Sequence, residues 1–528
     1  MNLKPLIAVV ATAAVLAGGA LVTATVELVG PARDDAVEMV PAEAFLYGNV
    51  FLDPSTPQKL ALEDLIAKFP EASTPEKAKV AITGLLDEGL KELGMTFASD
   101  VEPWLGTQVA FFMMSPGGVA GAPSGGPPAS VPGVGLLIAS DDPAATQAAL
   151  DKALASDAVM SEPGTPASYE SVDYVVAPDG TGAVGLIDDF LVFGTDAGIK
   201  AVVDARDGES LGDSDSYEEA VADLTEDRLA TFYMDPSKAL VSGLPPGVVP
   251  PAFASIGPLV SIVYARSDAI VFEASVSAGA QAMATASGTD LIETLPGDTW
   301  AAFGIPSFGR TIQQLIGQIM GAMPGAPPGG GTEFLEGQLQ MQFGLSLQDD
   351  LLSWLGDVAF FASGNSVRSI GGGVVIEATD PDRAAKAMPK IKAALERSGA
   401  PIKPLDMGTF DGFSLQDRSM PEPINFVLAD QRVLIIYGEV ATLAALGSDP
   451  SLAGTDEFSA AEASLGDGFS VAGYVDISSI VSIFEKEAPS DPVYEEDVKP
   501  ILDRFSFVVF GSRTDGDRLL TRAVIGVR

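Results

Sequence analysis

The sequence contains no histidine and no cysteine in 528 residues. Without histidine there is no imidazole general base, no Ser-His-Asp triad, no histidine-ligated zinc and no two-histidine iron site. Without cysteine there is no thiol nucleophile, thiolate metal site, iron–sulfur cluster, disulfide or lipid-carrying cysteine. Any catalysis by this chain would therefore depend on carboxylates, hydroxyls, lysine or tyrosine.

Positive charge is also scarce, because 30 Lys and Arg face 72 Asp and Glu, for a net charge of -42. Such a surface repels nucleic-acid phosphates and anionic lipid headgroups, and no basic run offsets it. We therefore expect no nucleic-acid partner. The acids are typical of a surface that keeps a chain with 47% apolar residues soluble. Adaptation to salt and a divalent-cation partner are the alternatives, and no motif supports a cation.

One long uncharged run lies at the N-terminus, at residues 6–26. As a helix it would rise about 31 Å, close to the roughly 30 Å hydrocarbon layer of a bilayer. Lys4 precedes it and mainly acidic residues follow, whereas cytoplasmic flanks favour cations. We therefore expect residues 1–27 to form a signal-anchor transmembrane helix in the cell membrane. The protein would be single-pass, with a cytoplasmic N-terminus and an extracytoplasmic body. A cleaved signal peptide is the alternative.

The rest of the sequence repeats itself once. The stretch "DVEPWLGTQVAFF" at residues 100–112 returns as "DDLLSWLGDVAFF" at residues 349–361. Further segments recur in the same order, from "VPAEAFLYGNV" and "LPGDTWAAFGI" to "ATFYMDPS" and "VAGYVDIS". This order predicts an internal duplication. The expected parts are a short stalk at residues 28–40, module one at 41–278, a linker at 279–295 and module two at 296–528.

Each copy mixes strand and helix patterns. The apolar runs "VAFFMM" and "VGLLIA" flank a Gly/Pro-rich loop and predict a hairpin, as does "GLIDDFLVFG". Helical patterns such as "DPAATQAALDKAL" lie between the strand patterns. Strands that pair with their sequence neighbours, mixed with packed helices, predict two tandem α+β modules with largely antiparallel sheets.

Trp104 and Trp354 occupy the same place in the two copies, each before Leu-Gly and a strand pattern. We expect the glycine to leave the preceding helix with a positive φ and the indole to cover the sheet at that corner. A ligand-stacking tryptophan is the alternative. Because both copies share the corner, a structural role is favoured.

Several short motifs have a plain structural interpretation. Asp-Pro occurs six times, and helix capping explains it better than cation binding. "GDSDSYEE" at residues 212–219 lacks the Gly of a calcium loop, so a helix cap is expected there too. "GESLG" around Ser210 lacks a histidine partner, and "GTGAVG" at residues 180–185 leads into a strand pattern. The Asp-Pro positions are Asp53, Asp142, Asp235, Asp380, Asp449 and Asp491.

The segments "VPAEAFLYGNVFLDPSTPQKLALEDLIAKFP", "DVEPWLGTQVAFF" and "LIDDFLVFGTDAGIKAVVDARDGESLGDSDSYEEAVADL" resemble a bacterial membrane-anchored family catalogued as domain of unknown function 3352. The resemblance covers nearly all of the chain after the apolar run and is clearest in the first copy. It implies a single N-terminal span and an exported acidic body. It implies no activity, cofactor or catalytic residue.

Three functions remain open at this point. The favoured one is a membrane-anchored, exported, non-catalytic binding or scaffold protein of the bacterial cell envelope, with an envelope protein, polymer or lipid as partner. The second is a carrier of lipid or another apolar ligand. The third is an envelope hydrolase that uses paired carboxylates such as Asp188–Asp189, Asp349–Asp350 or those at residues 495–497. We interpret these acids as a solvated face, and the sequence singles out no catalytic, cofactor-binding, metal or other binding residue and no cofactor.

Overall fold

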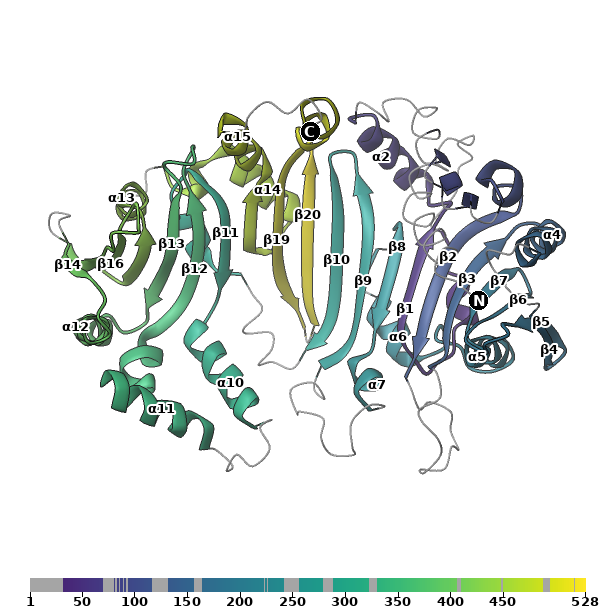
Figure 1. Cartoon of the computed structure of the whole chain (residues 1–528), viewed down its shortest axis with the longest axis horizontal. Coiled ribbons are helices and arrows are strands. Elements are labelled where there is room, and N and C mark those ends of the chain that lie inside the picture. The colour runs from purple at the N-terminus through teal and green to yellow at the C-terminus, as the bar shows by residue number, and fades with distance from the viewer. Residues whose placement is uncertain are drawn as a thin grey trace. The chain divides into compact units, whose positions relative to one another are not determined.

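A computed structural model describes most of the chain after residue 31 (Figure 1). The expected membrane helix at residues 1–27 lies outside the described residues. Within them, no helix is both long enough and apolar enough to cross a membrane. The described residues are 32–69, 80, 83–84, 86–88, 90–91, 94–115, 132–155, 164–222, 224–225, 227–241, 256–278, 288–321, 330–405, 410–447, 450–487, 494–516 and 518–528.

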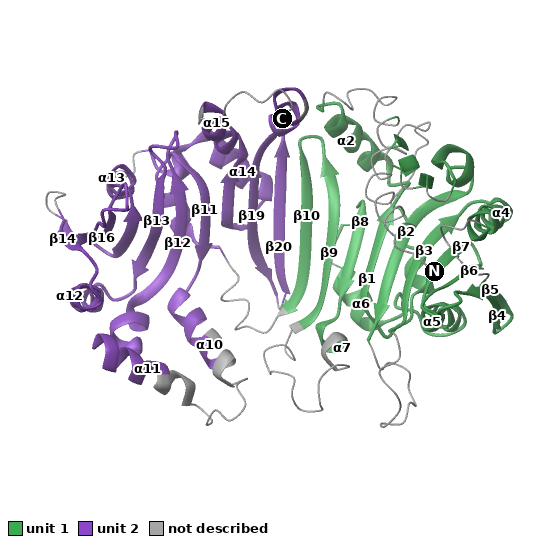
Figure 2. Ribbon diagram, in the orientation of Figure 1, with its two compact units in different colours: residues 1–277 green, residues 278–528 purple. Residues whose placement is uncertain are grey.

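The chain divides into two compact units, residues 1–277 and residues 278–528 (Figure 2). Each unit contains a large antiparallel sheet with helices packed against it, so the α+β class expected from the sequence is confirmed. The predicted hairpins also form, since β2 pairs with β3 and β6 pairs with β7.

The sheet of unit 1 has the order β10-β9-β8-β1-β2-β3-β7-β6-β5-β4. The neighbours from β9 to β4 pair antiparallel. In that order the strands are β10 (Ala269–Ala278), β9 (Ile256–Arg266), β8 (Ala230–Met234), β1 (Ala44–Phe51), β2 (Leu105–Met114), β3 (Val134–Ser140), β7 (Phe190–Gly194), β6 (Ala183–Ile187), β5 (Val172–Val176) and β4 (Thr165–Tyr169).

The sheet of unit 2 has the order β20-β19-β18-β11-β12-β13-β17-β16-β15-β14, with antiparallel neighbours throughout. In that order the strands are β20 (Arg518–Val527), β19 (Phe505–Asp515), β18 (Ser470–Asp476), β11 (Thr299–Ile305), β12 (Leu355–Ser363), β13 (Gly371–Ala378), β17 (Arg432–Tyr437), β16 (Ile424–Ala429), β15 (Asp411–Leu415) and β14 (Ile402–Pro404).

The two units share one strand order, because β11 to β20 occupy the places that β1 to β10 occupy in unit 1. An isolated bridge recurs as well, between Pro41 and Ser210 in unit 1 and between Pro296 and Ser451 in unit 2. Pro41 and Pro296 match in "VPAE" and "LPGD", and Ser210 and Ser451 begin the matched segments "SLGDSDSY" and "SLAGTDEF", so the bridge has the same place in both units.

Helices cover both faces of the unit 1 sheet. Side chains alternate along a strand, so Phe112 and Val109 of β2 point to opposite faces. Phe112 packs with Val202 of α5, and Val109 packs with Trp104 and Leu150 of α4. The helices are α2 (Thr56–Ile66), α4 (Pro143–Leu154), α5 (Asp196–Asp207), α6 (Asp215–Val221) and α7 (Pro236–Val241).

Unit 2 is covered in the same way. Val358 packs with Trp354 and with Met388 of α12 on one face of the sheet. Phe458 of α14 meets Tyr474 of β18 edge-on, with ring centroids 5.1 Å apart. The helices are α10 (Phe308–Gly321), α11 (Gly330–Phe343), α12 (Pro381–Arg397), α13 (Glu439–Gly447), α14 (Asp456–Leu465), α15 (Ile477–Glu487) and α16 (Lys499–Leu502).

The structure differs from the sequence expectation at the start of each unit. Residues 36–40, assigned above to a stalk, include Ala36 and Val40, which are fully buried in the core of unit 1. Ile292, assigned to the linker, is fully buried within a short 3-10 helix, Asp290–Thr294, next to β11, β12 and β18. Both segments were predicted to be connectors because they are short and carry acidic residues, but their apolar residues are buried in the core.

The tryptophan corner also differs in one respect. Trp104 and Trp354 are buried as expected, but Gly106 and Gly356 have ordinary rather than positive φ. Glycine is needed there because a neighbouring strand passes close by. A Cβ at Gly106 would lie 2.9 Å from the main-chain carbon of Ala139, and one at Gly356 would lie 2.9 Å from the main-chain oxygen of Glu377.

Candidate functional site

A pocket of about 150 Å³ lies within unit 2. Its wall is formed by the turn before β11, the residues just after β12, the start of α14, the end of β18 and one side of α15. These segments converge because β18 pairs with β11, β11 pairs with β12, and α15 follows β18 directly. The pocket therefore lies at one end of three adjacent strands.

Two hydroxyl groups in the pocket wall lack hydrogen-bond partners among the described residues, and of these only the Thr299 hydroxyl is fully enclosed. Tyr474 is 1% exposed and its hydroxyl makes no hydrogen bond there. Thr299 is 4% exposed, and its Oγ1 has no hydrogen-bond partner in the same part of the chain. An unpaired buried hydroxyl costs free energy, and native proteins usually pair such groups with protein, water or ligand. The Thr299 hydroxyl is such an enclosed group, whereas the Tyr474 hydroxyl opens into the pocket, where a ligand can reach it.

Carboxylates surround the Tyr474 hydroxyl. Burial raises the pKa of Tyr474 well above its usual value, and the charges of Asp476 and Glu457 raise it further. Tyr474 is therefore a neutral phenol at any physiological pH and offers both a donor and an acceptor. Asp298 completes the acidic side of the pocket.

Asp476 is held in place by the first turn of α15. Its Oδ1 accepts a hydrogen bond from the Ser479 main-chain N–H at 2.9 Å, and its Oδ2 accepts one from the Ser479 hydroxyl at 2.6 Å. Lys486 of the same helix also lines the pocket, and its Nζ donates to the main-chain oxygen of Asn365 at 3.0 Å. The lining thus carries three carboxylates and one ammonium group.

The matching positions of unit 1 are occupied differently. The hydroxyl of Tyr233, which matches Tyr474, lies 3.2 Å from the Ser216 hydroxyl. Lys238, which matches Ser479, donates from Nζ to the main-chain oxygen of Ala42 at 2.7 Å. In unit 1, side chains of the protein itself satisfy the groups that remain free in unit 2.

Unit 1 has a buried polar cluster of another kind, centred on Asp34. Its Oδ1 accepts from the Tyr47 hydroxyl at 2.5 Å and from Asn49 Nδ2 at 2.8 Å, and its Oδ2 accepts from the Tyr217 hydroxyl at 3.3 Å. Burial raises the pKa of Asp34, while the bond from Tyr47 and the charge of Arg228 partly oppose this rise. Since the carboxylate is enclosed by its own partners, we interpret the cluster as structural.

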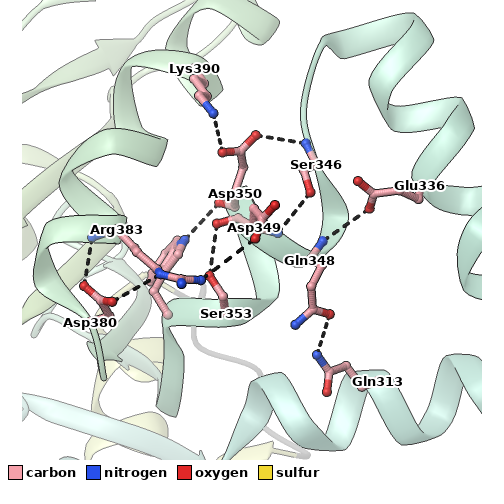
Figure 3. Close-up of polar contacts among 11 residues, drawn as sticks. Gln313, Glu336, Ser346, Gln348, Asp349, Asp350, Ser353, Asp380, Arg383 and Lys390 are labelled. Atoms are coloured by element: carbon pink, nitrogen blue, oxygen red, sulfur yellow. Dashed lines mark hydrogen bonds and ion pairs between the residues drawn. The ribbon is translucent and has the colours of Figure 1, made fainter.

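A polar network surrounds Asp350 at the tryptophan corner of unit 2 (Figure 3). Lys390 Nζ lies 2.6 Å from Asp350 Oδ1, and the Ser346 main-chain N–H donates to Oδ2 at 2.9 Å. The Trp354 indole donates to the main-chain oxygen of Asp350 at 2.9 Å. Burial tends to raise the pKa of Asp350, but the bonds from Lys390 and Ser346 lower it overall.

The same network ties three helical segments together (Figure 3). Glu336 of α11 accepts from the Leu347 main-chain N–H at 2.7 Å, and Gln313 of α10 donates to Gln348 at 2.8 Å. Unit 1 repeats the central part, with Lys152 2.5 Å from Asp100. Because the network recurs and its groups are paired internally, it positions the corner.

The paired acids expected on a solvated face divide between two environments. Asp188, with 56% of its side chain exposed, and Asp349, with 79%, do lie at the surface. Asp350 is 7% exposed, so the expectation is wrong for it. The cause is Lys390, which lies 40 residues further along the chain and supplies the countercharge. Glu495 and Glu496 are exposed.

The Asp-Pro motifs mostly cap helices, as predicted. Asp142 caps α4 through the Ala144 and Ala145 N–H groups, Asp380 caps α12 through Arg383, and Asp235 bonds to Ser237 N. Asp53 instead pairs with Lys59 at 2.5 Å, and Ser55 caps α2. Asp449 and Asp491 lie outside the described residues.

The remaining motifs behave as expected. In "GDSDSYEE", Ser214 caps α6, and its counterpart Thr455 caps α14. Ser210 lies in the turn after α5 and donates to Asp213 at 2.7 Å. The glycine motif at residues 180–185 runs into β6. Among the described residues, no group of three or more acidic side chains could hold a metal ion.

The fold and the pocket define a protein of two antiparallel α+β units with a small acidic pocket in the second. The chain belongs to the family described as "Protein of unknown function (DUF3352)", whose model matches residues 6–519. The match includes the whole N-terminal apolar run and all but the last nine residues of the two units. No curated protein matches the chain.

Some solved structures share limited similarity with the chain. "Structure of crystal form IV of TP0453" matches with 12% identity and a TM-score of 0.23, over 46% of this chain and 79% of that chain. "Structure of crystal form III of TP0453" matches with 12% identity and a TM-score of 0.23, over 48% and 81%. Scores this low carry no argument about fold or function.

Proposed function

We propose that the protein is a non-catalytic binding protein, anchored in the cell membrane by its N-terminal apolar run and exposed outside it, with the pocket of unit 2 as its binding site. The observation that carries this proposal is the hydroxyl of Tyr474, which has no partner among the described residues and opens into an acidic pocket. A ligand in the pocket could exchange a hydrogen bond with this hydroxyl.

We further infer that the two units arose by duplication of one α+β module. The shared strand order, the recurring bridge and the recurring tryptophan corner support this. After a duplication, one copy can keep a structural role while the other acquires a site. The closed side chains of unit 1 and the open pocket of unit 2 fit that division.

A native mass spectrum tests the binding function. Full-length protein purified from its own membrane in mild detergent should carry a small-molecule adduct, and Ser482→Trp should lose it because the indole would fill the pocket lined by Ser482. Ala385→Trp, at an exposed position of α12, is the matched control and should keep the adduct. A wild-type protein without any adduct, or an adduct that survives in Ser482→Trp, would overturn the proposal.

The absence of cysteine allows a direct test of the anchor and its orientation. Single-cysteine variants are treated with a membrane-impermeant maleimide in cells whose cytoplasmic membrane is intact and whose outer layers are open. Ala385→Cys, exposed on α12, should be labelled at once. Asn2→Cys should be labelled only after permeabilisation. If only Asn2→Cys were labelled in intact cells, the N-terminus would lie outside the membrane and the proposed orientation would be wrong.

A specific observation favours a second candidate, a carrier of lipid or another apolar ligand. Phe111 and Phe232 are 37% and 36% exposed and flank Gly48 on one face of the unit 1 sheet, with ring centroids 6.5 Å apart. Phe303 and Phe360 pair across β11 and β12 with 44% and 38% exposure. Neighbouring exposed aromatic side chains can provide an apolar surface for a lipid chain.

Titration of the full chain with a fluorescent fatty acid tests the carrier function. Phe303→Ser with Phe360→Ser should weaken binding markedly, whereas Ser482→Trp should leave it unchanged because the pocket is not involved. Equal binding by the double variant and the wild type would reject this candidate.

A further inference from the structure

The side chain of Lys238 in unit 1 occupies a polar site and pairs with its acceptor groups. Its Nζ donates to the Ala42 main-chain oxygen at 2.7 Å and lies 3.8 Å from Asp235 Oδ2. Asp235 is 4% exposed, so this ammonium group lies beside a buried carboxylate. A carbonyl oxygen and a carboxylate are the acceptors that a primary ammonium group requires.

Unit 2 keeps these acceptors and lacks the lysine. The segments "ATFYMDPSK" and "VAGYVDISS" match Asp235 with Asp476 and Lys238 with Ser479, and "VPAE" and "LPGD" match Ala42 with Gly297. Gly297, Asp476 and Ser479 all line the pocket of 150 Å³. The lysine side chain that fills the site in unit 1 is therefore replaced in unit 2 by a short hydroxyl and open space.

Two neighbouring replacements enlarge the pocket and make it more acidic. Ser115 of unit 1 donates from its hydroxyl to the Lys238 main-chain oxygen at 2.6 Å, and the matching residue of unit 2 is Gly364. Ser216, the partner of the Tyr233 hydroxyl, is matched by Glu457. At these matched positions serine replaces the lysine and glutamate replaces a serine, and the one ammonium group of the unit 2 lining belongs to Lys486.

Lys486 does not replace Lys238. Its Nζ donates to the Asn365 main-chain oxygen, and among the described residues it forms no ion pair with a carboxylate. The side chain is also exposed, whereas 28% of the Lys238 side chain is exposed. The carboxylate of Asp476 is thus left without the cation that its counterpart Asp235 has in unit 1.

We propose that the pocket of unit 2 binds the primary ammonium group of a small ligand through the Gly297 carbonyl oxygen, the Asp476 carboxylate and the Tyr474 hydroxyl. The ligand supplies the group that Lys238 supplies in unit 1. This assignment rests on the proposed function, because it names the ligand class of the same pocket. The amine can belong to a free alkylamine or to a lysine-type side chain of a peptide.

The test uses n-butylammonium, which reproduces the lysine side chain, with the full chain in detergent micelles. Saturation-transfer NMR should show binding of n-butylammonium, and much less of n-butanol or butyrate, which have similar size and no positive charge. Nα-acetyl-lysine-N-methylamide is run in parallel. Stronger binding of this peptide-like probe identifies a peptide source, and stronger binding of n-butylammonium identifies a free amine.

The matched variant is Ser479→Lys, which gives unit 2 the lysine of unit 1. It should fold with an unchanged or higher Tm and lose the n-butylammonium signal, whereas Ala385→Lys on the surface should keep it. Tyr474→Phe removes one acceptor and should weaken binding about tenfold, which remains measurable even where Ser479→Lys folds poorly.

Each remaining outcome decides between the two proposals. Binding of butyrate or n-butanol in preference to n-butylammonium, lost in Ser482→Trp, overturns the ammonium assignment and leaves the binding function standing. Binding of n-butylammonium that persists in Ser479→Lys and in Tyr474→Phe overturns the assignment as well. No binding of any probe, together with no adduct in the native mass spectrum, overturns both.

Discussion

Removal of the buried carboxylate of Asp34 should destabilise unit 1 without affecting unit 2. In Asp34→Ala, the Tyr47 hydroxyl and one N–H of Asn49 lose an acceptor, and both side chains are 0% exposed. Each unsatisfied buried donor costs about 1–3 kcal/mol, so unfolding of unit 1 should become easier by about 2–6 kcal/mol. Asp34→Asn keeps an acceptor oxygen for both donors and should cost far less.

The two variants also predict a pH dependence. Burial raises the pKa of Asp34 in the folded protein. A raised folded pKa contributes stability that is fully present below the unfolded pKa, about 3.9, and is lost as the pH rises through the folded value. The unfolding free energy of the wild type minus that of Asp34→Asn should therefore fall as the pH rises from about 4 through the folded pKa.

Urea unfolding followed by pulsed hydrogen exchange and mass spectrometry measures both effects, because peptides of units 1 and 2 are resolved separately. Unit 2 is the internal control and should unfold at the same urea concentration in all three proteins. A wild-type midpoint for unit 1 in Asp34→Ala, or a pH-independent difference between wild type and Asp34→Asn, would refute the reasoning.

Three further predictions concern single contacts. Lys238→Ala should destabilise unit 1 by about 1–2 kcal/mol, because the Ala42 main-chain oxygen loses its donor. Added n-butylammonium should partly restore the Tm of this variant. No restoration would show that the amine does not fit the space left by the lysine side chain. Asp350→Ala should destabilise unit 2 by about 2–3 kcal/mol, because buried donors lose their acceptor. Lys390→Ala should cost about 1 kcal/mol or less, because Lys390 is half exposed. Urea midpoints measure both effects, and equal effects would contradict this prediction. Gly106→Ala should cost about 1–3 kcal/mol, since the new methyl group would meet the main chain of Ala139, whereas helical Gly84→Ala should be neutral or stabilising in a thermal melt.

The α+β class and the hairpins could be predicted from local patterns in the sequence. The hairpins were predicted because apolar runs flank turn residues, and β2–β3 and β6–β7 form as expected. The caps at Asp142, Asp380 and Ser214 were predicted because capping depends on residues two or three positions apart. The strand order of the whole sheet was not predictable, because it depends on pairings between strands far apart in the chain, such as β1 with β8.

The site was missed because its signal lies in a difference between the copies. The repeat was recognised from residues that match, such as Trp104 and Trp354. The pocket depends on residues that do not match, above all Lys238 against Ser479 and Ser216 against Glu457. Both differences are visible in the aligned repeat. Without the structure, however, nothing indicated that these positions lie together around a buried tyrosine.

The buried acids show a second limit of sequence reasoning. Asp34 lay in the segment assigned to a stalk, and Asp350 belonged to an acidic pair interpreted as a solvated face. Their partners Tyr217 and Lys390 lie 183 and 40 residues further along the chain. Burial of a carboxylate depends on such distant partners, and a single sequence does not show them.

A crystal structure of the full-length protein grown with n-butylammonium tests the central claim most directly. It should show one ordered amine in the pocket of unit 2, with its nitrogen between the Gly297 carbonyl oxygen and the Asp476 carboxylate, where Lys238 Nζ lies in unit 1. A pocket that holds only water, or that is closed by the ammonium group of Lys486, would contradict the account.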